Sequence, residues 1–313
     1  MTSHRMKNRL HSLFLLAALV ALLWLLGWFF AGIYGIIWAT LLGIVPLFAG
    51  IRIFPALTLK MYGARPLAHL ETPRLFAIVE ELSAGAELPA APRLYYIESN
   101  TPLIFSVGLG KEGAIALSDG LLRLLTVREL AGVLAHEISH IRHNDTWVMC
   151  FADVVSRITS SLSLLGQLLV LINLPLLFFG DVLLPWGPLL LMMFAPTISA
   201  FLQLALSRTR EFDADLDAAR LSADPAGLAA ALAKLDEYQR RIMRRLLIPG
   251  HRGTEPSLLR THPKTEERVR LLLDLEKELQ GREIPAENSH LLLPPHLRGS
   301  TRKPHRGLGR WWF

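Results

Sequence analysis

Hydrophobic positions gather in two long blocks, and polar positions fill the chain between them. Residues 13–51 contain no charged side chain, and residues 158–206 contain only Asp181. Because a membrane-spanning helix needs about 20 apolar residues, each block has room for two spans. A turn near Gly32 to Gly35 divides the first block, and a Gly- and Pro-containing segment around Asp181 divides the second. The pattern therefore predicts two transmembrane hairpins.

Lys and Arg flank the apolar blocks on one side only. By the positive-inside bias, this places the two termini and the whole polar middle in the cytoplasm. The mean hydropathy of +0.35 supports a membrane protein. For the second hairpin the alternative is a pair of core helices, since Gln167, Asn173 and four prolines dilute it. The flanking cations are Arg5, Lys7, Arg9, Arg52, Lys60, Arg65, Arg157, Arg208 and Arg210.

The polar middle has the pattern of a helix followed by a small sheet. Residues 72–90 have helical spacing, with Pro73 at the first helical position. Three short segments are rich in β-branched or aromatic residues and are bounded by turn residues: PRLYYIES, NTPLIFSVGLG and GAIALSDGLL. Each is expected to form a strand.

A second group of helices follows the predicted sheet. Thr126 and Glu129 have the spacing of a capping box, which starts a helix near Val127. Two later helices are expected on either side of a break at Asp224, and a short charged helix over 263–280. The apolar residues that recur at helical spacing after Val127 are Leu130, Val133, Leu134, Ile138 and Ile141.

Residues 133–145, VLAHEISHIRHND, add metal-binding side chains to this helix. His136 and His140 are four residues apart, so both imidazoles project from one face and can bind a single Zn²⁺. Glu137 is placed to take a proton from a water molecule at the metal. The alternative is a pair of solvated or core histidines, and the rest of the chain must decide between the two.

A catalytic zinc site needs a third protein ligand. His143 is nearest in sequence, but a helix that continues past His140 turns it away from the site. Glu211 lies in SRTREFDADLDAA, where Asp215 shares its helical face. One carboxylate can therefore bind metal while the other accepts the free N–H of a ligating histidine. The intervening hairpin returns to the cytoplasmic face and brings both motifs to one membrane surface, where Asp145 is expected either to brace the HEISH helix or to be solvated.

HEISH, followed by a hairpin, SRTREFDAD and THPKTEERV, resembles the HtpX family of bacterial membrane zinc endopeptidases, relatives of the CAAX prenyl protease. The similarity covers roughly 93–273. By position it implies a zinc site with a general base and a supporting carboxylate. The residues are His136, His140 and Glu211 as ligands, Glu137 as base and Asp215 as support.

The resemblance also implies a substrate cleft that includes His262, Pro263 and Arg268. A positioned His262 can donate to the developing oxyanion, although a histidine before proline in a loop is otherwise solvated. Phe105 and Ser106, in the expected edge strand, are the other candidate substrate-binding residues. The family usually has an Asn- and Ala-containing segment where this chain reads PLIFSVG, so no subsite preference is implied.

We therefore expect a zinc endopeptidase, with one Zn²⁺ per chain, in the bacterial inner membrane. It would hydrolyse misfolded or membrane proteins on the cytoplasmic side, in quality control and stress response. The alternative is a catalytically silent, zinc-stabilised scaffold or adaptor, but a structural site has no use for a base such as Glu137. Polypeptides and the lipid bilayer are the expected partners, with no nucleic acid.

The expected fold is mainly α: two transmembrane helical hairpins and an α+β zincin-like cytoplasmic catalytic domain with a small sheet. Cys150 is the only cysteine, which excludes an internal disulfide. The expected parts are an N-terminus (1–12), a first hairpin (13–51), a first catalytic part (52–157), a second hairpin (158–206), a second catalytic part (207–293) and a basic tail (294–313).

Overall fold

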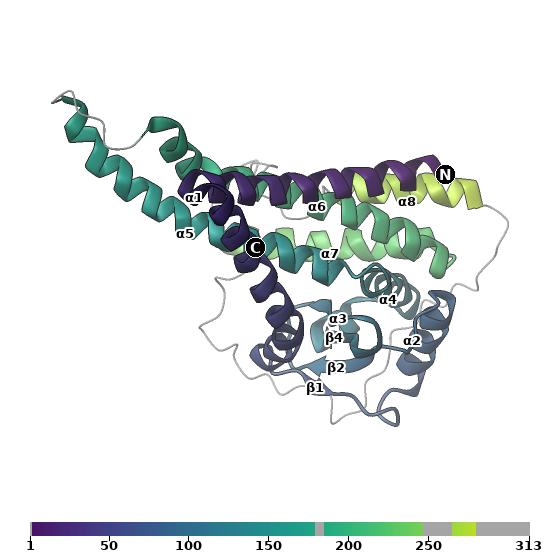
Figure 1. Cartoon of the computed structure of the whole chain (residues 1–313). Helices are drawn as coiled ribbons and strands as arrows, with labels where there is room; N and C mark the ends of the chain where they lie inside the picture. The colour runs from purple at the N-terminus through teal and green to yellow at the C-terminus, as the bar shows by residue number, and fades with distance from the viewer. Residues whose placement is uncertain (1, 179–184, 247–264, 280–313) are drawn as a thin grey trace. The chain divides into compact units, whose positions relative to one another are not determined.

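The chain forms two compact units (Figure 1). Long apolar helices make up most of the first unit, and the second contains a small mixed sheet. The computed structural model describes residues 2–178, 185–246 and 265–279. One unit comprises 1–53 and 147–210, and the other comprises 54–146 and 211–313. Three long helices supply the first unit: α1 (Thr2–Met61), α5 (Asp145–Phe178) and α6 (Trp186–Leu221).

Helix α1 turns back on itself at Gly32, within the segment where the sequence predicts a turn. Gly32 has φ 57° and ψ −133°, a conformation that glycine adopts without steric cost. The two halves pack closely where Gly27 meets Gly35. A Cβ added to Gly35 would lie 1.8 Å from the carbonyl oxygen of Gly27, so the absence of a side chain permits this approach. Trp24 donates its indole N–H to Thr40 Oγ1 at 3.0 Å. Small residues at such crossings are typical of transmembrane helix pairs.

Polar side chains join α5 to α6. Ser156 Oγ lies 2.9 Å from Ser199 Oγ and donates to Gln203 Oε1 at 2.8 Å. Ser163 Oγ donates to the carbonyl oxygen of Met193 at 3.1 Å. Hydrogen bonds between helices satisfy polar groups that lipid cannot, so the polar residues of the second block are compatible with a membrane hairpin.

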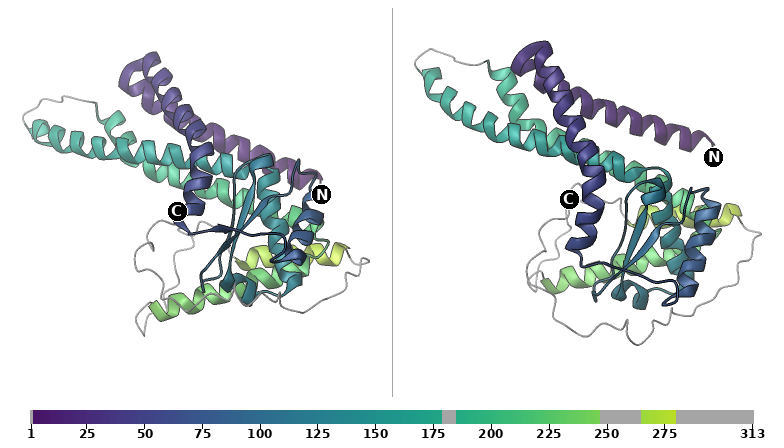
Figure 2. Two further views of the ribbon diagram at one scale, coloured as in Figure 1. Left: turned by 90° about the horizontal axis from the view of Figure 1, so that it is seen from below. Right: turned by 60° about the horizontal axis from the view of Figure 1, so that its bottom comes forward.

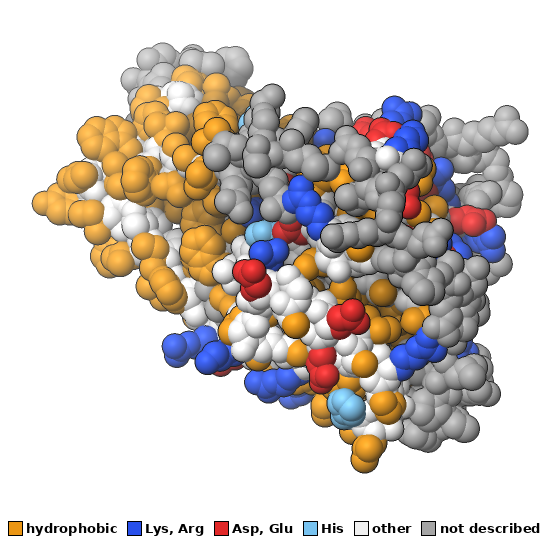
Figure 3. Space-filling view, turned by 90° about the vertical axis from the view of Figure 1, so that its right-hand side faces the viewer, with side chains coloured by type: hydrophobic (Ala, Val, Ile, Leu, Met, Phe, Trp, Pro, Cys, Tyr) orange, Lys and Arg blue, Asp and Glu red, His pale blue; other side chains and the backbone are white. Residues whose placement is uncertain are grey.

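The outward faces of these helices are apolar. Leu164, Leu171 and Phe201 are 70%, 67% and 52% exposed, whereas core helices of a soluble protein would bury such residues. Figure 3 shows a region of surface where hydrophobic side chains gather without charged ones. Among the described residues, three helical stretches are long and apolar enough to cross a membrane: Leu10–Gly50, Asp145–Pro175 and Trp186–Leu221. The predicted tip at Asp181 lies outside the described residues.

In the described residues, the second unit is built on a sheet, which Figure 2 shows among the surrounding helices. The sheet has four strands in the order β1-β2-β4-β3. β2 and β4 are parallel, and the outer pairs are antiparallel. β3 therefore forms one edge of the sheet. The three predicted strands are confirmed, whereas the two-residue β1 was not predicted. The bounds are β1 (Arg65–Pro66), β2 (Arg93–Ile97), β3 (Ile104–Val107) and β4 (Ala114–Ser118).

One predicted strand is too long. The segment GAIALSDGLL was expected to be extended throughout, but β4 ends at Ser118. The Ser118 hydroxyl accepts a hydrogen bond from the N–H of Leu121 at 3.1 Å, which makes it the N-cap of a helix. The remaining elements are α2 (Pro73–Gly85), a 3₁₀ turn η1 (Gly110–Glu112), α3 (Asp119–Leu124), α4 (Val127–Arg142), α7 (Pro225–Leu246) and α8 (Thr265–Leu279).

Helix α4 is held at its start and along its apolar face. The predicted capping box between Thr126 and Glu129 is present, and Lys234 of α7 also contacts Glu129, at 2.8 Å. Gly132 lets α7 approach, since an added Cβ would lie 3.0 Å from the backbone of Leu228. All five residues of the predicted apolar stripe are buried in the core with the strands. The opposite face of α4 carries the polar site.

Candidate metal centre

The side chains of His136, His140 and Glu211 meet in the second unit. The Nε2 atoms of the two histidines are 3.0 Å apart. Glu211 Oε2 lies 3.5 Å from His136 Nε2, and Oε1 lies 3.7 Å from His140 Nε2. His136 and Glu211 are buried, and His140 is partly buried. Three donor atoms, two from α4 and one from α6, thus face one point.

Each histidine has a carboxylate at its other ring nitrogen. His136 Nδ1 lies 3.0 Å from Asp215 Oδ1, and His140 Nδ1 lies 2.8 Å from Asp145 Oδ2. These carboxylates favour a proton on Nδ1 and leave a lone pair on each Nε2. The two Nε2 atoms lie 3.0 Å apart, a distance that either a proton shared between them or a cation bound by both lone pairs can account for. The donor set therefore fits a metal ion.

The spacing and charge of the group fit zinc. An ion about 2.0–2.1 Å from tetrahedral donors separates those donors by about 3.3 Å, close to the three distances above. Three carboxylates, those of Glu211, Asp215 and Asp145, contact the imidazoles. Arg268 places a cationic side chain against two of them, Glu211 and Asp215. Carboxylates gathered around two imidazoles favour a bound cation.

The electrostatic field of the site favours positive charge at His136. Burial by itself lowers the pKa of His136, but Asp215 and Glu211 outweigh it and raise this pKa to about 10. Burial raises the pKa of the Asp215 carboxyl, and the guanidinium of Arg268 outweighs that effect and lowers it. Asp215 therefore stays ionised beside the ring of His136.

A short turn places Asp145 against His140. Helix α4 ends at Arg142, and Asn144 then adopts φ 55°, a left-handed conformation that asparagine tolerates. Helix α5 begins at once with Asp145, which is buried. The sequence left this residue either bracing the helix or solvated, and in the structure it contacts His140.

His143 faces away from the three donor atoms. Its Nε2 lies 3.1 Å from Asp217 Oδ2, and its Nδ1 lies 3.3 Å from Ser139 Oγ. Asp217 is 3% exposed and contacts His143 from α6. Sequence reasoning missed Asp217, although it follows Asp215 by two residues in a run of three aspartates at alternate positions.

Arg268 occupies a place that the sequence did not indicate. Its place in the substrate cleft stays a prediction; in the structure its side chain is 8% exposed and lies against Glu211 and Asp215. A signal for burial was present, because Arg268, Leu272 and Leu275 recur at i, i+4 and i+7 on one face of α8, and all three are buried.

The other predicted cleft residues divide into two groups. Phe105 and Ser106 lie on β3, at the edge of the sheet, and both are partly buried. The ring of Tyr62, just after α1, lies 5.1 Å from that of Phe105. His262 and Pro263 lie outside the described residues.

Three comparisons relate the chain to known proteins. Residues 69–276 match the family described as Peptidase family M48. A Protease HtpX homolog from Methylibium petroleiphilum is 33% identical over 290 residues, covering 86% of this chain and 98% of that protein. A Protease HtpX homolog from Burkholderia mallei is 32% identical over 290 residues, covering 87% and 98%. The crystal structure of S. mikatae Ste24p aligns with a TM-score of 0.46 and 19% identity, over 87% of this chain and 66% of that one.

The geometry predicts which residues retain metal. We expect Glu211→Ala to weaken metal binding by more than the roughly 10- to 100-fold typical of residues outside the ligand set. His143→Ala should leave metal content nearly unchanged, because that side chain faces Asp217. Metal analysis after dialysis against a graded chelator measures both. Loss of metal in the His143 variant would contradict the assignment of the third ligand.

Proposed function

Because the chain belongs to peptidase family M48, whose members are metalloproteases, we propose that it is a membrane-bound zinc endopeptidase whose zinc is held by His136, His140 and Glu211. The observation that supports this most is the pair of facing Nε2 atoms, each with a carboxylate at its opposite ring nitrogen. Three protein donors leave a position for water and substrate, which a catalytic zinc needs and a structural zinc lacks.

The chain's own groups then carry the proton transfers. When bound, zinc supplies Lewis acidity, which acidifies water and polarises a peptide carbonyl. Glu137, buried beside His136 on α4, accepts the proton of the attacking water and delivers it to the leaving amine. The water oxygen bonds to the carbonyl carbon and the C–N bond breaks. Asp215 and Asp145 keep the two imidazoles in the tautomer that binds metal.

The open edge of the sheet suits an extended substrate. Within the part of the chain that the structure describes, strand β3 pairs with β4 on one side and ends the strand order on the other, so its outer backbone groups suit pairing with a peptide. Phe105 and Ser106 on this strand are proposed to contact substrate. His262 is proposed to stabilise the oxyanion, and it lies outside the described residues.

Continuity of α6 supports a site close to the membrane. This helix contains both the fourth apolar segment, ending near Leu206, and Glu211. Five helical residues correspond to a rise of about 8 Å. We infer that the enzyme acts at the cytoplasmic face of the inner membrane, on loosely folded cytoplasmic segments of membrane proteins, in quality control.

Glu137→Gln tests the chemistry. Glutamine keeps the shape of the side chain but cannot accept a proton, so cleavage of casein should fall by about 10²- to 10⁴-fold. Metal content should equal that of the unaltered protein, because Glu137 is not a ligand. Full activity in this variant, measured at equal metal loading, would show that another group is the base.

Reporter fusions test the topology. Cations cluster at the cytoplasmic ends of the predicted spans, so fusions after Arg65 or Arg220 or at the C-terminus should give cytoplasmic signals. A fusion after Asp181, at the predicted hairpin tip, serves as the control and should give a periplasmic signal. A periplasmic signal at any of the first three positions would refute the orientation.

Product mapping tests the substrate class. Mass spectrometry should place most cuts in cytoplasmic segments of membrane proteins close to a span, and casein should be cut more slowly. The matched control is the same mixture treated with the Glu137→Gln protein. Cuts mainly in periplasmic loops, or equal cutting of folded soluble proteins, would contradict a membrane-surface site.

A further inference from the structure

Four side chains from three helices form a closed ring of contacts beside the candidate metal position. Arg268 of α8 places Nε 2.6 Å and Nη2 2.7 Å from the two carboxylate oxygens of Asp215. Its remaining nitrogen, Nη1, lies 2.9 Å from Glu211 Oε2. Asp215 in turn contacts His136, and His136 faces Glu211. Arg268 thus touches one metal-ligand candidate directly and another through Asp215.

Glu211 has two oxygens that face the histidines almost equally. Oε2 lies 3.5 Å from His136 Nε2, and Oε1 lies 3.7 Å from His140 Nε2. A carboxylate with both oxygens free can bind zinc through both. That binding mode would occupy the position that a hydrolytic site must keep open. A hydrolytic site therefore requires a contact that leaves only one oxygen of Glu211 available to the metal.

We propose that Arg268 is a positioning residue that holds Oε2 of Glu211, so that Glu211 offers only Oε1 to the metal. This inference rests on the proposed zinc-dependent hydrolysis. The guanidinium suits the task because its planar fork binds Asp215 with two N–H groups and still presents a third to Glu211. A lysine ammonium has no such fork and cannot hold both carboxylates in these orientations.

The guanidinium of Arg268 can lie beside the proposed metal position because Asp215 neutralises the charge of that guanidinium. Asp215 is fully buried and Arg268 is 6% exposed. A buried charge is costly unless it is paired, and here both partners are paired. Asp215 therefore has two roles, since it orients His136 and keeps the guanidinium in place.

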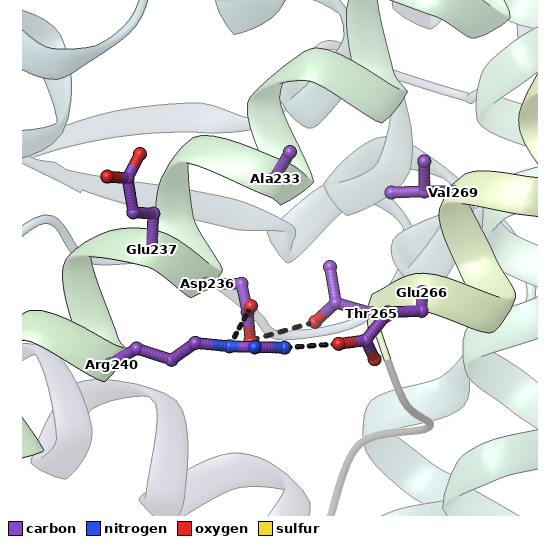
Figure 4. A pocket seen from close by; sticks show the side chains of 7 residues that line it. All are labelled: Ala233, Asp236, Glu237, Arg240, Thr265, Glu266 and Val269. Carbon is purple, nitrogen blue, oxygen red and sulfur yellow. Dashed lines mark hydrogen bonds and ion pairs between the residues drawn. The ribbon is translucent and has the colours of Figure 1, made fainter.

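Helix α8 is also held at its start by contacts with α7. Figure 4 shows a pocket between α7 and α8 where Arg240 of α7 contacts Asp236, at 2.5 Å, and Glu266 of α8. Thr265 Oγ1 donates to Asp236 Oδ1 at 3.2 Å. Leu272 packs into the core. These contacts do not involve Arg268, so a conservative change at Arg268 should leave α8 docked.

The test compares Arg268→Lys with the unaltered protein, each loaded fully with Co²⁺ in place of zinc. Four-coordinate Co²⁺ absorbs visible light more strongly than five-coordinate Co²⁺. We expect a strong absorption in the unaltered protein and a weaker one in the variant, because Glu211 then binds through both oxygens. With zinc, kcat should fall by about 10- to 100-fold, and KM should stay within about twofold.

Arg270→Lys is the matched control, because Arg270 is exposed on the same helix and should change neither spectrum nor kcat. If Arg268→Lys does not fold, Arg268→Gln repeats the test, since its amide has two donors in place of five and cannot bind Asp215 with two N–H groups while also donating to Glu211. Unchanged spectra and kcat would overturn the inference. Failure of both variants to fold or to hold Co²⁺ would also overturn it, by showing a structural role.

The outcomes separate this inference from the function on which it rests. An unaltered protein that neither binds metal nor cleaves casein would contradict the proposed function. An active, metal-loaded protein whose Arg268 variants behave normally would contradict only the positioning role. A weak, five-coordinate Co²⁺ spectrum in the active unaltered protein would likewise overturn the single-oxygen role of Glu211.

Discussion

The buried ion pair between Asp215 and Arg268 supports the rest of the site. Removing either partner would leave an uncompensated charge in the interior, at a cost of about 3–5 kcal/mol. The pair links three helices, because Asp215 of α6 contacts His136 of α4 and Arg268 of α8 contacts Glu211 of α6. Helix α8, which is far from the HEISH motif in sequence, thereby becomes part of the site.

Contacts along α4 also hold in place the helix that carries His136 and His140. The capping box and Lys234 hold the start of the helix, and Gly132 brings α7 close to its middle. At its end, the turn at Asn144 returns the chain so that Asp145 meets His140. Each imidazole is thus in contact with a carboxylate, and such contacts fix the orientation of metal-binding side chains.

Local patterns predicted much of this arrangement. Apolar blocks, helical spacing and the capping box identified the long helices and α4, and HEISH with Glu211 identified a group that the structure brings together. The residues that local patterns left unassigned depend on tertiary contacts. The N-cap role of Ser118 shortened a strand, β1 has only two residues, and Arg268 meets Asp215 across 53 residues of chain. No local pattern encodes such a pairing.

The proposed site holds one ion shared by α4 and α6, and anomalous X-ray scattering at the zinc edge locates such an ion directly. In crystals of the active protein, we expect a single peak about 2.0–2.2 Å from His136 Nε2, His140 Nε2 and one oxygen of Glu211. A peak at another site, or no peak in crystals of protein that cleaves its substrate, would contradict the central claim.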